Sequence, residues 1–307
     1  MSQASLRGKK VLIAGGSGLV GTTLCKKLKR LGAKVAILSR DNDSESSHKV
    51  FVWDLKRKTI DPKAIKWADY IINLAGAGIA DERWTKERKK AILNSRIKTT
   101  ALLYEQVKKS RKKLKAYISA SAIGYYGMEI SEKIYKESDK PGKDFLAKVC
   151  KRWEQEAKRF SRLKIRTVLV RTAVVLSSHG GALPSLAHPA RLCLAAPLGS
   201  GKQYVPWIHI DDLCAIYIAA LQNPDLRGPY NAAAPEHVTN RQLMRTTAKV
   251  LHRPFWPIPV PAFLLRAILG EMAITILGGS RISSAKLEKT GFKFRHPKLR
   301  PTLKKLL

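Results

Sequence analysis

The sequence contains few cysteines, and their spacing excludes several classes of protein. Four cysteines are spread over 307 residues and no two form a Cys-x-x-Cys pair, so neither a zinc site nor a disulfide framework is indicated. No apolar run reaches the roughly 18 residues that a membrane helix needs, because the best candidate, residues 255–277, contains Arg266, Glu271 and prolines. Residues 1–10 also lack the apolar core of a signal peptide. We therefore expect reduced thiols, no metal site, no membrane partner and a cytoplasmic location.

Acidic side chains are scarce relative to basic ones. The chain has 23 Asp and Glu against 58 Lys and Arg, a net charge of +35, and such a charge attracts polyanions. The basic residues are spread along the whole chain, and the densest run lies between Lys108 and Lys115. The sequence has no basic motif interleaved with aromatic residues of the kind found in RNA-binding sheets. We therefore favour a solvated basic surface and keep association with nucleic acid as an alternative.

The first half of the chain alternates short apolar runs with amphipathic patterns. Strands are expected at residues 11–14, 34–38, 51–53, 70–74, 116–120 and 165–170. Helices are expected at 20–31, 84–109 and 144–160. Strands that alternate with helices favour a parallel sheet with crossover connections. The series predicts an α/β fold with a Rossmann-type, doubly wound parallel sheet.

After about residue 175 the pattern loosens into glycine- and proline-rich loops. Thr239 is a good N-cap for a helix that extends to Leu251. A proline cluster at 254–261 indicates a linker into a last helical segment. The expected division is a Rossmann domain at 8–230 and a small, mostly helical C-terminal domain at 250–307, with residues 175–250 contributing to the substrate side.

Three glycines follow the first expected strand at a spacing typical of a dinucleotide-binding turn. Gly15, Gly18 and Gly21 form Gly-x-x-Gly-x-x-Gly between a strand and a helix. The first permits a sharp turn, the second lets the backbone approach a pyrophosphate, and the third lets the helix pack closely on the sheet. The N-terminus of the helix offers free N–H groups to the phosphates. The residues expected to contact the cofactor here are Gly15, Ser17, Gly18, Leu19, Val20 and Gly21.

The end of the second expected strand indicates which dinucleotide binds. Folds that bind NAD often place an acidic residue there for the ribose hydroxyls, but this chain has Ser39 followed by Arg40. A guanidinium makes charge-assisted, bidentate hydrogen bonds to a 2′-phosphate. We therefore expect NADP(H) in preference to NAD(H). Asp41 and Asp43 follow closely and keep NAD(H) as the alternative, in which Arg40 is a solvated surface residue.

Two further positions lie where folds of this kind touch a dinucleotide. Asp54 follows the third strand, where an acid commonly meets the adenine amino group. Leu74, Ala75 and Gly76 end the fourth strand, where small residues let the backbone pass the ribose. Each of these residues is equally consistent with an ordinary turn.

These features together resemble a known family. The glycine turn, Arg40, the Asn-Leu-Ala-Gly turn at 73–76 and residues 119–127 are similar to the extended short-chain dehydrogenase/reductase superfamily. Within it, residues 79–84 and 207–212 resemble the YfcH-type epimerase family, an NAD-dependent epimerase/dehydratase domain followed by a C-terminal domain of unknown function. The resemblance covers nearly the whole chain. It implies a Rossmann fold, a nicotinamide cofactor and a sugar-nucleotide-like or carbonyl substrate.

The resemblance also implies a catalytic pattern, from which the chain departs. Short-chain dehydrogenases combine a Ser or Thr with Tyr-x-x-x-Lys, whose lysine lowers the pKa of the phenol. Ser121 fits the hydroxyl position, but the register places Leu146 and Cys150 where the tyrosine and the lysine are expected. Arg96 stands near the place of the superfamily's helix asparagine. The usual proton relay is therefore not assumed.

Two tyrosines close to Ser121 are the alternative source of a phenol. Tyr125 is preferred over Tyr126, and aromatic packing on the cofactor or substrate is the simpler explanation for each. A serine that only bonds the local backbone is the corresponding alternative for Ser121. The candidate catalytic residues are Ser121, Tyr125 and Tyr126.

The loop that follows residues 199–201 faces the substrate in related folds. Lys202 is expected to neutralise a phosphate and Trp207 to stack on a ring, with Tyr204 between them. The candidate substrate-binding residues are therefore Lys202, Tyr204 and Trp207.

Four other polar residues, three of them close to Trp207 in the sequence, are considered for a role in the site. His209 is expected to be a hydrogen-bonded structural residue rather than a catalyst. Asp211 and Asp212 open a helix, where acidic groups favour the dipole, so we expect them to act as caps. Arg171 ends the sixth strand and either reaches the cofactor or substrate, or forms a structural ion pair.

The sequence thus predicts an NADP(H)-dependent oxidoreductase or epimerase that acts on a small polar substrate, with nucleotide sugars among the candidates. Because Tyr-x-x-x-Lys is missing, the question of whether the protein is an enzyme stays open. A non-catalytic NADPH-binding redox sensor is the first alternative. A nucleic-acid-associated basic protein is the second. The sequence does not indicate an oligomeric state.

Overall fold

The computed structural model describes residues 4–41 and 48–307. Asp43, which supported the NAD(H) alternative, lies outside the described residues. Within the described part of the chain, no helix is both long and apolar enough to cross a membrane.

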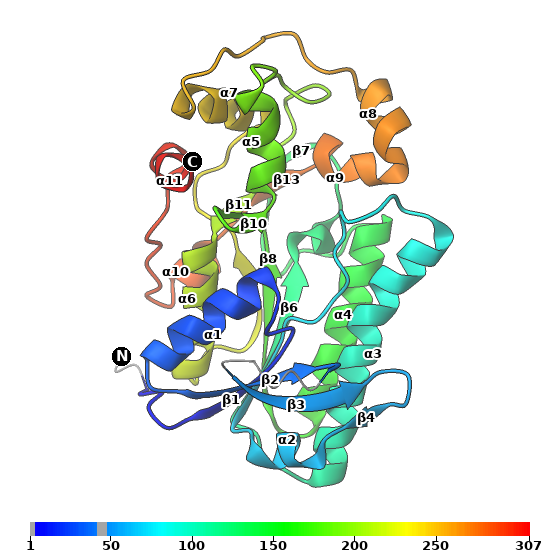
Figure 1. Cartoon of the computed structure of the whole chain (residues 1–307), viewed down its shortest axis with the longest axis vertical. Coiled ribbons are helices and arrows are strands. Elements are labelled where there is room, and N and C mark those ends of the chain that lie inside the picture. The colour runs from blue at the N-terminus through cyan, green and yellow to red at the C-terminus, as the bar shows by residue number, and fades with distance from the viewer. Residues whose placement is uncertain (1–3, 42–47) are drawn as a thin grey trace.

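Eight strands form one sheet through the middle of the molecule (Figure 1). In spatial order they are β12 (Gly228–Ala232), β8 (Arg166–Thr172), β6 (Ala116–Ala122), β5 (Tyr70–Asn73), β1 (Lys10–Ala14), β2 (Lys34–Ser39), β3 (Lys49–Asp54) and β4 (Thr59–Ile60). Neighbours run parallel except for the short β4, which is antiparallel to β3. The order reverses between β1 and β5, and ligands of open α/β sheets bind at such a switch point. The predicted Rossmann-type, doubly wound sheet is confirmed.

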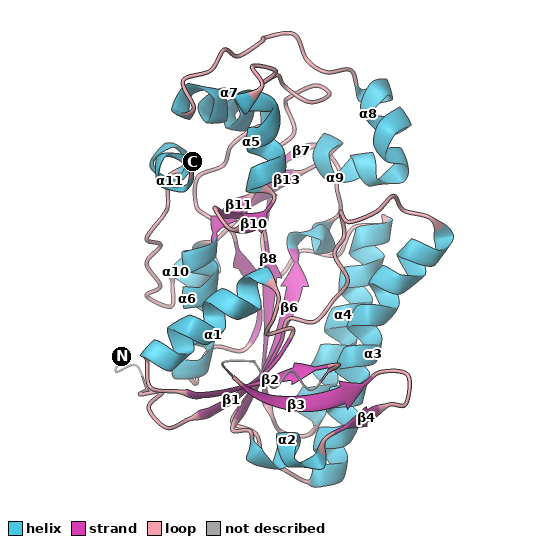
Figure 2. Ribbon diagram, in the orientation of Figure 1, coloured by secondary structure: helices cyan, strands magenta, loops and turns pink. Residues whose placement is uncertain are grey.

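Helices cover both faces of this sheet (Figure 2). One face carries α1 (Leu19–Arg30) and α6 (Ile210–Gln222), and the other carries α2 (Pro62–Trp67), α3 (Lys86–Ser110) and α4 (Phe145–Arg162). Strand β1 shows the cause, because successive side chains of a strand point to opposite faces. Val11 and Ile13 join the apolar cluster of α1 and α6, while Leu12 and Ala14 join that of α2, α3 and α4. A sheet buried on both faces therefore requires the continuous apolar run seen in β1.

Several elements from the second half of the chain build a layer beyond the carboxyl ends of the strands, in the upper half of Figure 1. A small sheet joins β9 (Val174–Ser177), β10 (Gly180–Gly181) and β11 (Trp207–His209). It shares an apolar cluster with α5 (Leu183–Arg191), α7 (Asn240–Val250) and α11 (Leu299–Leu306). Thr239 is the N-cap of α7, as predicted, and forms a capping box with Gln242.

The C-terminal segment is mostly helical and is tied to the main sheet. It contains α8 (Ala262–Leu269), η2 (Gly270–Ala273), α9 (Ile274–Leu277), β13 (Ser280–Ile282) and α10 (Ala285–Glu288) before α11. Strand β13 pairs in parallel with β7 (Ser131–Tyr135), which follows the short 3-10 helix η1 (Ile123–Tyr126). The amide of Asn231, in β12, donates to the carbonyl of Ser283 at 3.0 Å.

Asp212 provides another link to this segment. Its fully buried carboxylate accepts the backbone N–H groups of Arg295 and His296 at 2.8 and 2.9 Å. Helix α6 is capped instead by His209, whose Nδ1 accepts the N–H of Asp211 at 3.0 Å. Asp211 and Asp212 both lie in the first turn of α6, as expected, but neither is its N-cap. The oxygens of Asp212 bind the C-terminal segment, and Asp211 pairs with Lys27 at 2.9 Å.

Candidate functional site

The glycine turn between β1 and α1 is built for close approach of backbone. Gly15 has a φ of +79°, and a Cβ there would lie 2.9 Å from the backbone of Leu74 and Ala75. A Cβ on Gly21 would lie 2.2 Å from the carbonyl oxygen of Gly15, so α1 packs directly on the turn. A Cβ on Gly18 would meet only that same oxygen, at 3.5 Å. Gly18 therefore faces open space.

The N-terminus of α1 is free to receive an anion. Its N-cap, Gly18, makes no side-chain hydrogen bond, and its first turn carries no acidic residue. The first N–H groups of a helix have no partner within the helix, and its dipole favours negative charge there. Ser17 is exposed, and Leu19 and Val20 are half-buried. The turn thus presents N–H groups rather than side chains to a ligand.

Arg40 directly follows β2, beside this turn. It is exposed, and no acidic residue in the described part of the chain pairs with it. The N–H of Asp41 bonds to the hydroxyl of Ser39 at 3.4 Å. The Arg40 guanidinium is therefore available to a ligand phosphate.

Asp54, at the end of β3, organises its own turn. Its Oδ1 accepts the N–H groups of Lys56 and Arg57 at 2.7 and 3.0 Å. The N–H of Arg57 is the main reason why the pKa of Asp54 lies below its usual range. These bonds supply the turn role that the sequence left open, and contact with adenine stays a prediction.

Asn73 shapes the turn that ends β5. Its amide donates to Thr100 and Tyr117, both at 3.1 Å, and its Oδ1 accepts the N–H of Ala75 at 3.2 Å. This bonding sets the path of Leu74, Ala75 and Gly76 alongside Gly15. Sequence reasoning placed the cofactor contacts on those three residues and missed that buried Asn73 positions them.

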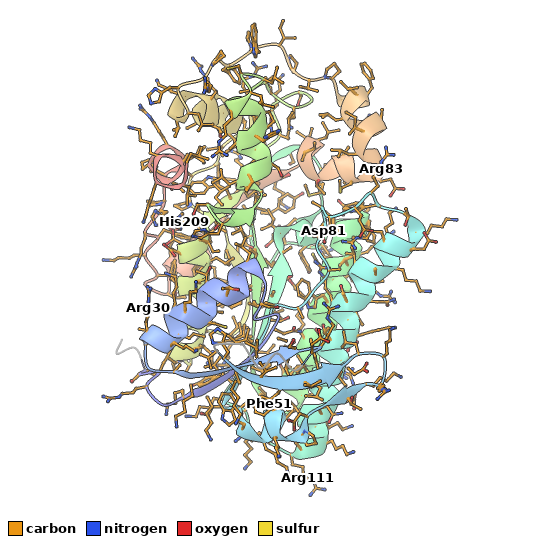
Figure 3. All side chains as sticks on the ribbon, in the orientation of Figure 1. Arg30, Phe51, Asp81, Arg83, Arg111 and His209 are labelled. Atoms are coloured by element: carbon orange, nitrogen blue, oxygen red, sulfur yellow. The ribbon has the colours of Figure 1, made fainter. Side chains whose placement is uncertain are left out.

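The loop that leaves this turn is held against the C-terminal segment. The Arg83 guanidinium donates to the carbonyl of Ala267 in α8, and Figure 3 shows Arg83 beside that helix. Trp84 shares an apolar cluster with Met272 of η2. The C-terminal segment therefore fixes the loop that follows Gly76.

Ser121, at the end of β6, is part of a buried ion-pair network. Its hydroxyl donates to Oε1 of Glu154 at 2.8 Å. Arg171, from β8, donates to the same carboxylate through Nε and Nη2 at 2.7 and 2.9 Å. All three side chains are buried. Arg171 thus forms the structural ion pair that was one of its two expected roles, and the Ser121 proton is engaged with Glu154.

The two neighbouring tyrosines differ in how their hydroxyls are used. Tyr126 donates to Asn231 at 2.7 Å and accepts from Arg171 at 2.9 Å, and burial raises its pKa to about 12. Tyr125 is half-buried, its ring lies over the Arg171 guanidinium at 3.5 Å, and its hydroxyl has no hydrogen-bond partner among the described residues. Of the three candidate catalytic residues, Tyr125 alone keeps an unused hydroxyl.

The positions of the missing Tyr-x-x-x-Lys are apolar. Leu146 and Cys150 are buried on α4, and burial, followed by the charge of Glu154, raises the pKa of the Cys150 thiol to about 12. Arg96, from α3, reaches this place instead. Its guanidinium lies over the ring of Trp153 at 5.2 Å.

The three candidate substrate contacts lie in different environments. Lys202 is exposed, and the hydroxyl of Tyr204 donates to Glu132 at 3.0 Å. Trp207 is fully buried in β11, in a cluster with Leu176 and other apolar residues. The expected stacking role of Trp207 does not fit this placement, because its indole exposes no face to a ligand.

One group of potential metal ligands lies together in the described part of the chain: His209, Asp211 and His296. Two of the donors are engaged, because Nδ1 of His209 accepts the N–H group of Asp211 and Asp211 pairs with Lys27 at 2.9 Å, whereas Nε2 of His209 is buried without a hydrogen-bond partner in the described part of the chain. The two imidazoles stack with their centres 3.8 Å apart. Burial lowers the pKa of His209 to about 4. His209 is therefore a structural residue, as expected.

Comparison with known proteins adds the family. The sequence pattern of the NAD dependent epimerase/dehydratase family matches residues 11–233, and a domain of unknown function matches residues 260–306. The epimerase family protein YfhF of Bacillus subtilis is 35% identical over 298 residues, which cover 97% of each chain. An epimerase family protein of Staphylococcus saprophyticus is 36% identical over 302 residues, which cover 97% of this chain and 99% of that one.

Solved structures agree with this assignment. The human epimerase family protein SDR39U1, crystallised with NADPH, has a TM-score of 0.86 and 32% identity over 97% of this chain and 98% of that one. A nucleoside-diphosphate sugar epimerase from Corynebacterium glutamicum has a TM-score of 0.80 and 30% identity over 98% of this chain and 58% of that one. UDP-glucose 4-epimerase from Thermus thermophilus, in complex with NAD, shares the fold at 18% identity and a TM-score of 0.74.

The sheet order and the bare glycine turn define a dinucleotide-binding protein of the Rossmann class. With these relatives and the matched sequence patterns, the chain belongs to the NAD-dependent epimerase/dehydratase family, in the extended short-chain dehydrogenase/reductase group, as its motifs predicted.

Proposed function

We propose that this protein binds NADP(H) in preference to NAD(H) and acts as an oxidoreductase or epimerase on a small polar substrate of the nucleotide-sugar class. The observation that carries the proposal is the exposed Arg40 after β2, which no acidic residue among residues 4–41 and 48–307 pairs with, next to a glycine turn whose open side is Gly18. A guanidinium there adds hydrogen bonds to a 2′-phosphate on the order of 1.5–3 kcal/mol each. The NADPH bound to the human relative supports the same choice.

A bound nicotinamide would exchange a hydride with a carbon of the substrate. The chain's own contribution is to hold the dinucleotide and to place one proton donor. The N–H groups of the turn receive the pyrophosphate, and Arg40 receives the 2′-phosphate. Tyr125 is the proposed donor, because its hydroxyl has no hydrogen-bond partner among the described residues and its ring is held against the Arg171 guanidinium at 3.5 Å. Ser121 and Tyr126 then position this region through their buried bonds.

The substrate class is supported by two features. Lys202 is exposed in the loop after Gly201, where its ammonium is available to a phosphate. A nucleoside-diphosphate sugar epimerase is among the relatives at 30% identity. A diphosphate-bearing substrate would complement both Lys202 and the basic surface of the chain.

Cofactor titration tests the proposal directly. Isothermal titration of the purified protein with NADPH and with NADH should give tighter binding of NADPH, by at least about tenfold, which corresponds to about 1.4 kcal/mol. Equal affinities would contradict the preference. Binding of neither nucleotide would contradict the proposal as a whole.

A non-catalytic NADPH sensor is the second candidate, and one observation favours it. The positions of the usual catalytic tyrosine and lysine hold Leu146 and Cys150, both buried. An enzyme should oxidise NADPH in the presence of nucleotide sugars or carbonyl compounds, and Tyr125→Phe should remove this turnover and leave NADPH affinity unchanged. A sensor should bind NADPH and show no turnover with any member of such a panel.

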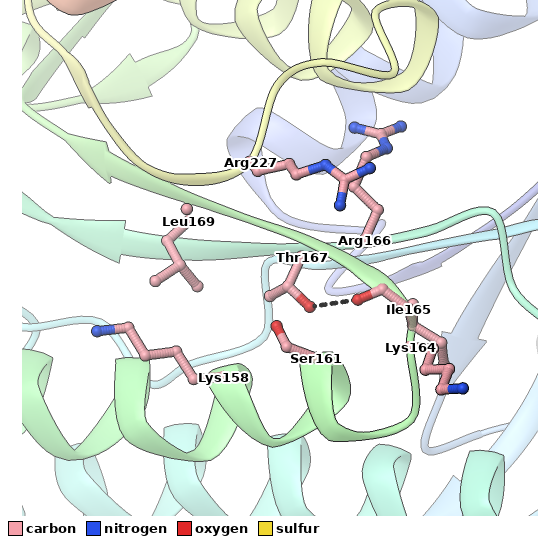
Figure 4. A pocket seen from close by; sticks show the side chains of 9 residues that line it. Lys158, Ser161, Lys164, Ile165, Arg166, Thr167, Leu169 and Arg227 are labelled. Atoms are coloured by element: carbon pink, nitrogen blue, oxygen red, sulfur yellow. Dashed lines mark hydrogen bonds between the residues drawn. The ribbon is translucent and has the colours of Figure 1, made fainter.

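A basic cavity gives the nucleic-acid alternative a specific location. A cavity of about 380 Å³ beside α4 and β8 is lined by Lys158, Lys164, Arg166 and Arg227, with no acidic residue in its lining (Figure 4). Arg166 is partly engaged, because it donates to the carbonyls of two residues near the end of α6. The cavity lies at the amino end of β8, away from the glycine turn, so phosphate binding there would be independent of the cofactor.

A further inference from the structure

Arg96 is a buried cation without a counter-charge. It lies on α3 and is 8% exposed, and no acidic residue in the described part of the chain forms an ion pair with it. Its one hydrogen bond runs from Nη1 to the carbonyl of Ile92, one turn earlier, at 2.9 Å. A guanidinium has five N–H donors, so the others find no acceptor among the described residues.

This arrangement leaves most of the Arg96 donors without an acceptor from the described chain. A buried charge that is neither paired nor fully hydrogen-bonded is costly, and burial is the main influence that lowers the pKa of Arg96. The nearby Arg171, which is 1% exposed, shows the usual solution, a bidentate pair with Glu154. No carboxylate in the described chain pairs with Arg96 in this way, so its remaining donors are available to acceptors from outside the protein.

The position of Arg96 indicates which ligand supplies them. A Cβ on Gly76 would lie 3.1 Å from Cζ of Arg96, so the guanidinium borders the turn that ends β5. Strand β5 is the first strand beyond the switch point, on the opposite side of β1 from β2 and Arg40. A dinucleotide lies across this point, with one nucleotide half on each side. With the 2′-phosphate at Arg40, the nicotinamide half lies over β5, beside Arg96.

The same place lacks the cation that the superfamily pattern puts there. The lysine position is Cys150, a buried neutral thiol, and the charge of Arg96 acts directly on that thiol. Arg96 reaches the place from α3 and is held against Trp153 of α4. A cation is therefore present at the expected location but comes from a different helix.

We propose that Arg96 positions the cofactor by donating hydrogen bonds to the ribose hydroxyls of the nicotinamide half, in place of the missing lysine. The inference rests on the proposed function, because it needs a bound dinucleotide. The planar guanidinium offers parallel donors that suit a pair of adjacent hydroxyl oxygens. It does not release a proton at ordinary pH, so Arg96 holds the cofactor and takes no part in proton transfer.

The test compares two ligands that differ in the nicotinamide half. Adenosine 2′,5′-bisphosphate carries the adenine, its ribose and the 2′-phosphate, and NADPH carries these and the nicotinamide riboside. Arg96→Met should weaken NADPH binding by about tenfold or more, the loss of one charge-assisted hydrogen bond, and should leave the affinity for adenosine 2′,5′-bisphosphate within about twofold. Arg96→Lys should recover part of the NADPH affinity, because it restores the cation.

Arg40→Met is the matched control, since it should weaken both ligands. An equal loss of both ligands in Arg96→Met would show that Arg96 only supports the fold, and would overturn the inference. Unchanged NADPH affinity would overturn it as well. If Arg96→Met does not fold, Arg96→Gln, which also lacks the charge, gives the same comparison. Failure of the wild-type protein to bind NADPH would instead contradict the proposed function, and this outcome is seen before any variant is made.

Discussion

Arg171 and Glu154 form a bidentate ion pair inside the protein, with Nε–Oε1 and Nη2–Oε2 distances of 2.7 and 2.9 Å. Neither residue is more than 2% exposed. The pair joins the end of β8 to the middle of α4, and Ser121 from β6 adds a third bond to the same carboxylate. The pair therefore fixes the position of the Arg171 guanidinium, against which the ring of Tyr125 lies.

Removal of one partner of this pair should strongly destabilise the protein. Glu154→Gln leaves Arg171 buried without a counter-charge, and we expect the free energy of unfolding to fall by about 3 kcal/mol or more. Urea denaturation measures this loss. Glu156→Gln, two residues along the same helix, breaks only a partly exposed pair with Arg159 and should cost less than about 1 kcal/mol. Equal losses in the two variants would contradict the role given to the buried pair.

Two substitutions in the glycine turn should separate thermal stability from NADPH affinity. Gly21→Ala places a Cβ 2.2 Å from the carbonyl oxygen of Gly15, so it should lower the melting temperature by several degrees or prevent folding. Gly18→Ala meets no such contact, and its φ of −76° suits alanine, so thermal unfolding should be unchanged. NADPH affinity should nevertheless fall by about tenfold, because the methyl group occupies the open side of the turn. Unchanged NADPH affinity in Gly18→Ala would exclude this turn as the phosphate site.

The stability of the protein should depend on pH through His209. Its pKa is lowered from 6.5 to about 4 in the folded state, first by burial and second by the adjacent His296. As the pH falls below about 6.5, the unfolded chain takes up a proton that the folded chain refuses, so stability decreases until about pH 4, by up to about 3 kcal/mol. His209→Asn keeps a residue that can cap α6 and should flatten the curve over this range. Parallel curves for wild type and variant, from urea unfolding at several pH values, would assign the pH dependence to other groups.

Much of the first half of the fold could be predicted from the sequence, because local pattern and tertiary structure agree there. A buried parallel strand such as β1 is recognisable as an apolar run, and an amphipathic helix such as α4 is recognisable from apolar residues at helical spacing. Strand β12 was not predicted, because it begins with Gly228 and Pro229, which are uncommon in strands. Its pairing with β8 holds it in the sheet. The β7–β13 pair joins residues far apart in the chain, which no local pattern reveals.

The candidate site was predictable in part for a similar reason. Backbone geometry follows from glycine spacing, so the turn at Gly15 could be located. Side-chain partnerships across strands cannot be read in the same way, and Trp207 was expected to stack on a ring because the loop after residues 199–201 faces the substrate in related folds. One feature of the sequence could have indicated the buried ion pair. Glu154 lies next to Trp153 on the apolar side of α4, where an acidic residue needs a buried partner.

The net charge of +35 makes a separate prediction about polyanions. We expect weak, non-specific binding of duplex and single-stranded oligonucleotides at low salt, which disappears near about 150 mM salt because released counterions drive it. Fluorescence anisotropy over a salt series measures this dependence. Lys164→Glu should reduce the low-salt binding if the cavity beside α4 contributes to it. Binding that persists at about 150 mM salt would favour the nucleic-acid alternative.

The preference for NADPH is measured as the ratio of NADPH to NADH affinity in the wild-type protein and in Arg40→Asp. We expect the wild type to prefer NADPH. We expect Arg40→Asp to weaken NADPH binding by about a hundredfold, through the loss of a bidentate pair and the gain of a repulsive charge, with a far smaller change for NADH. Equal losses for the two nucleotides, or a wild-type preference for NADH, would contradict this expectation.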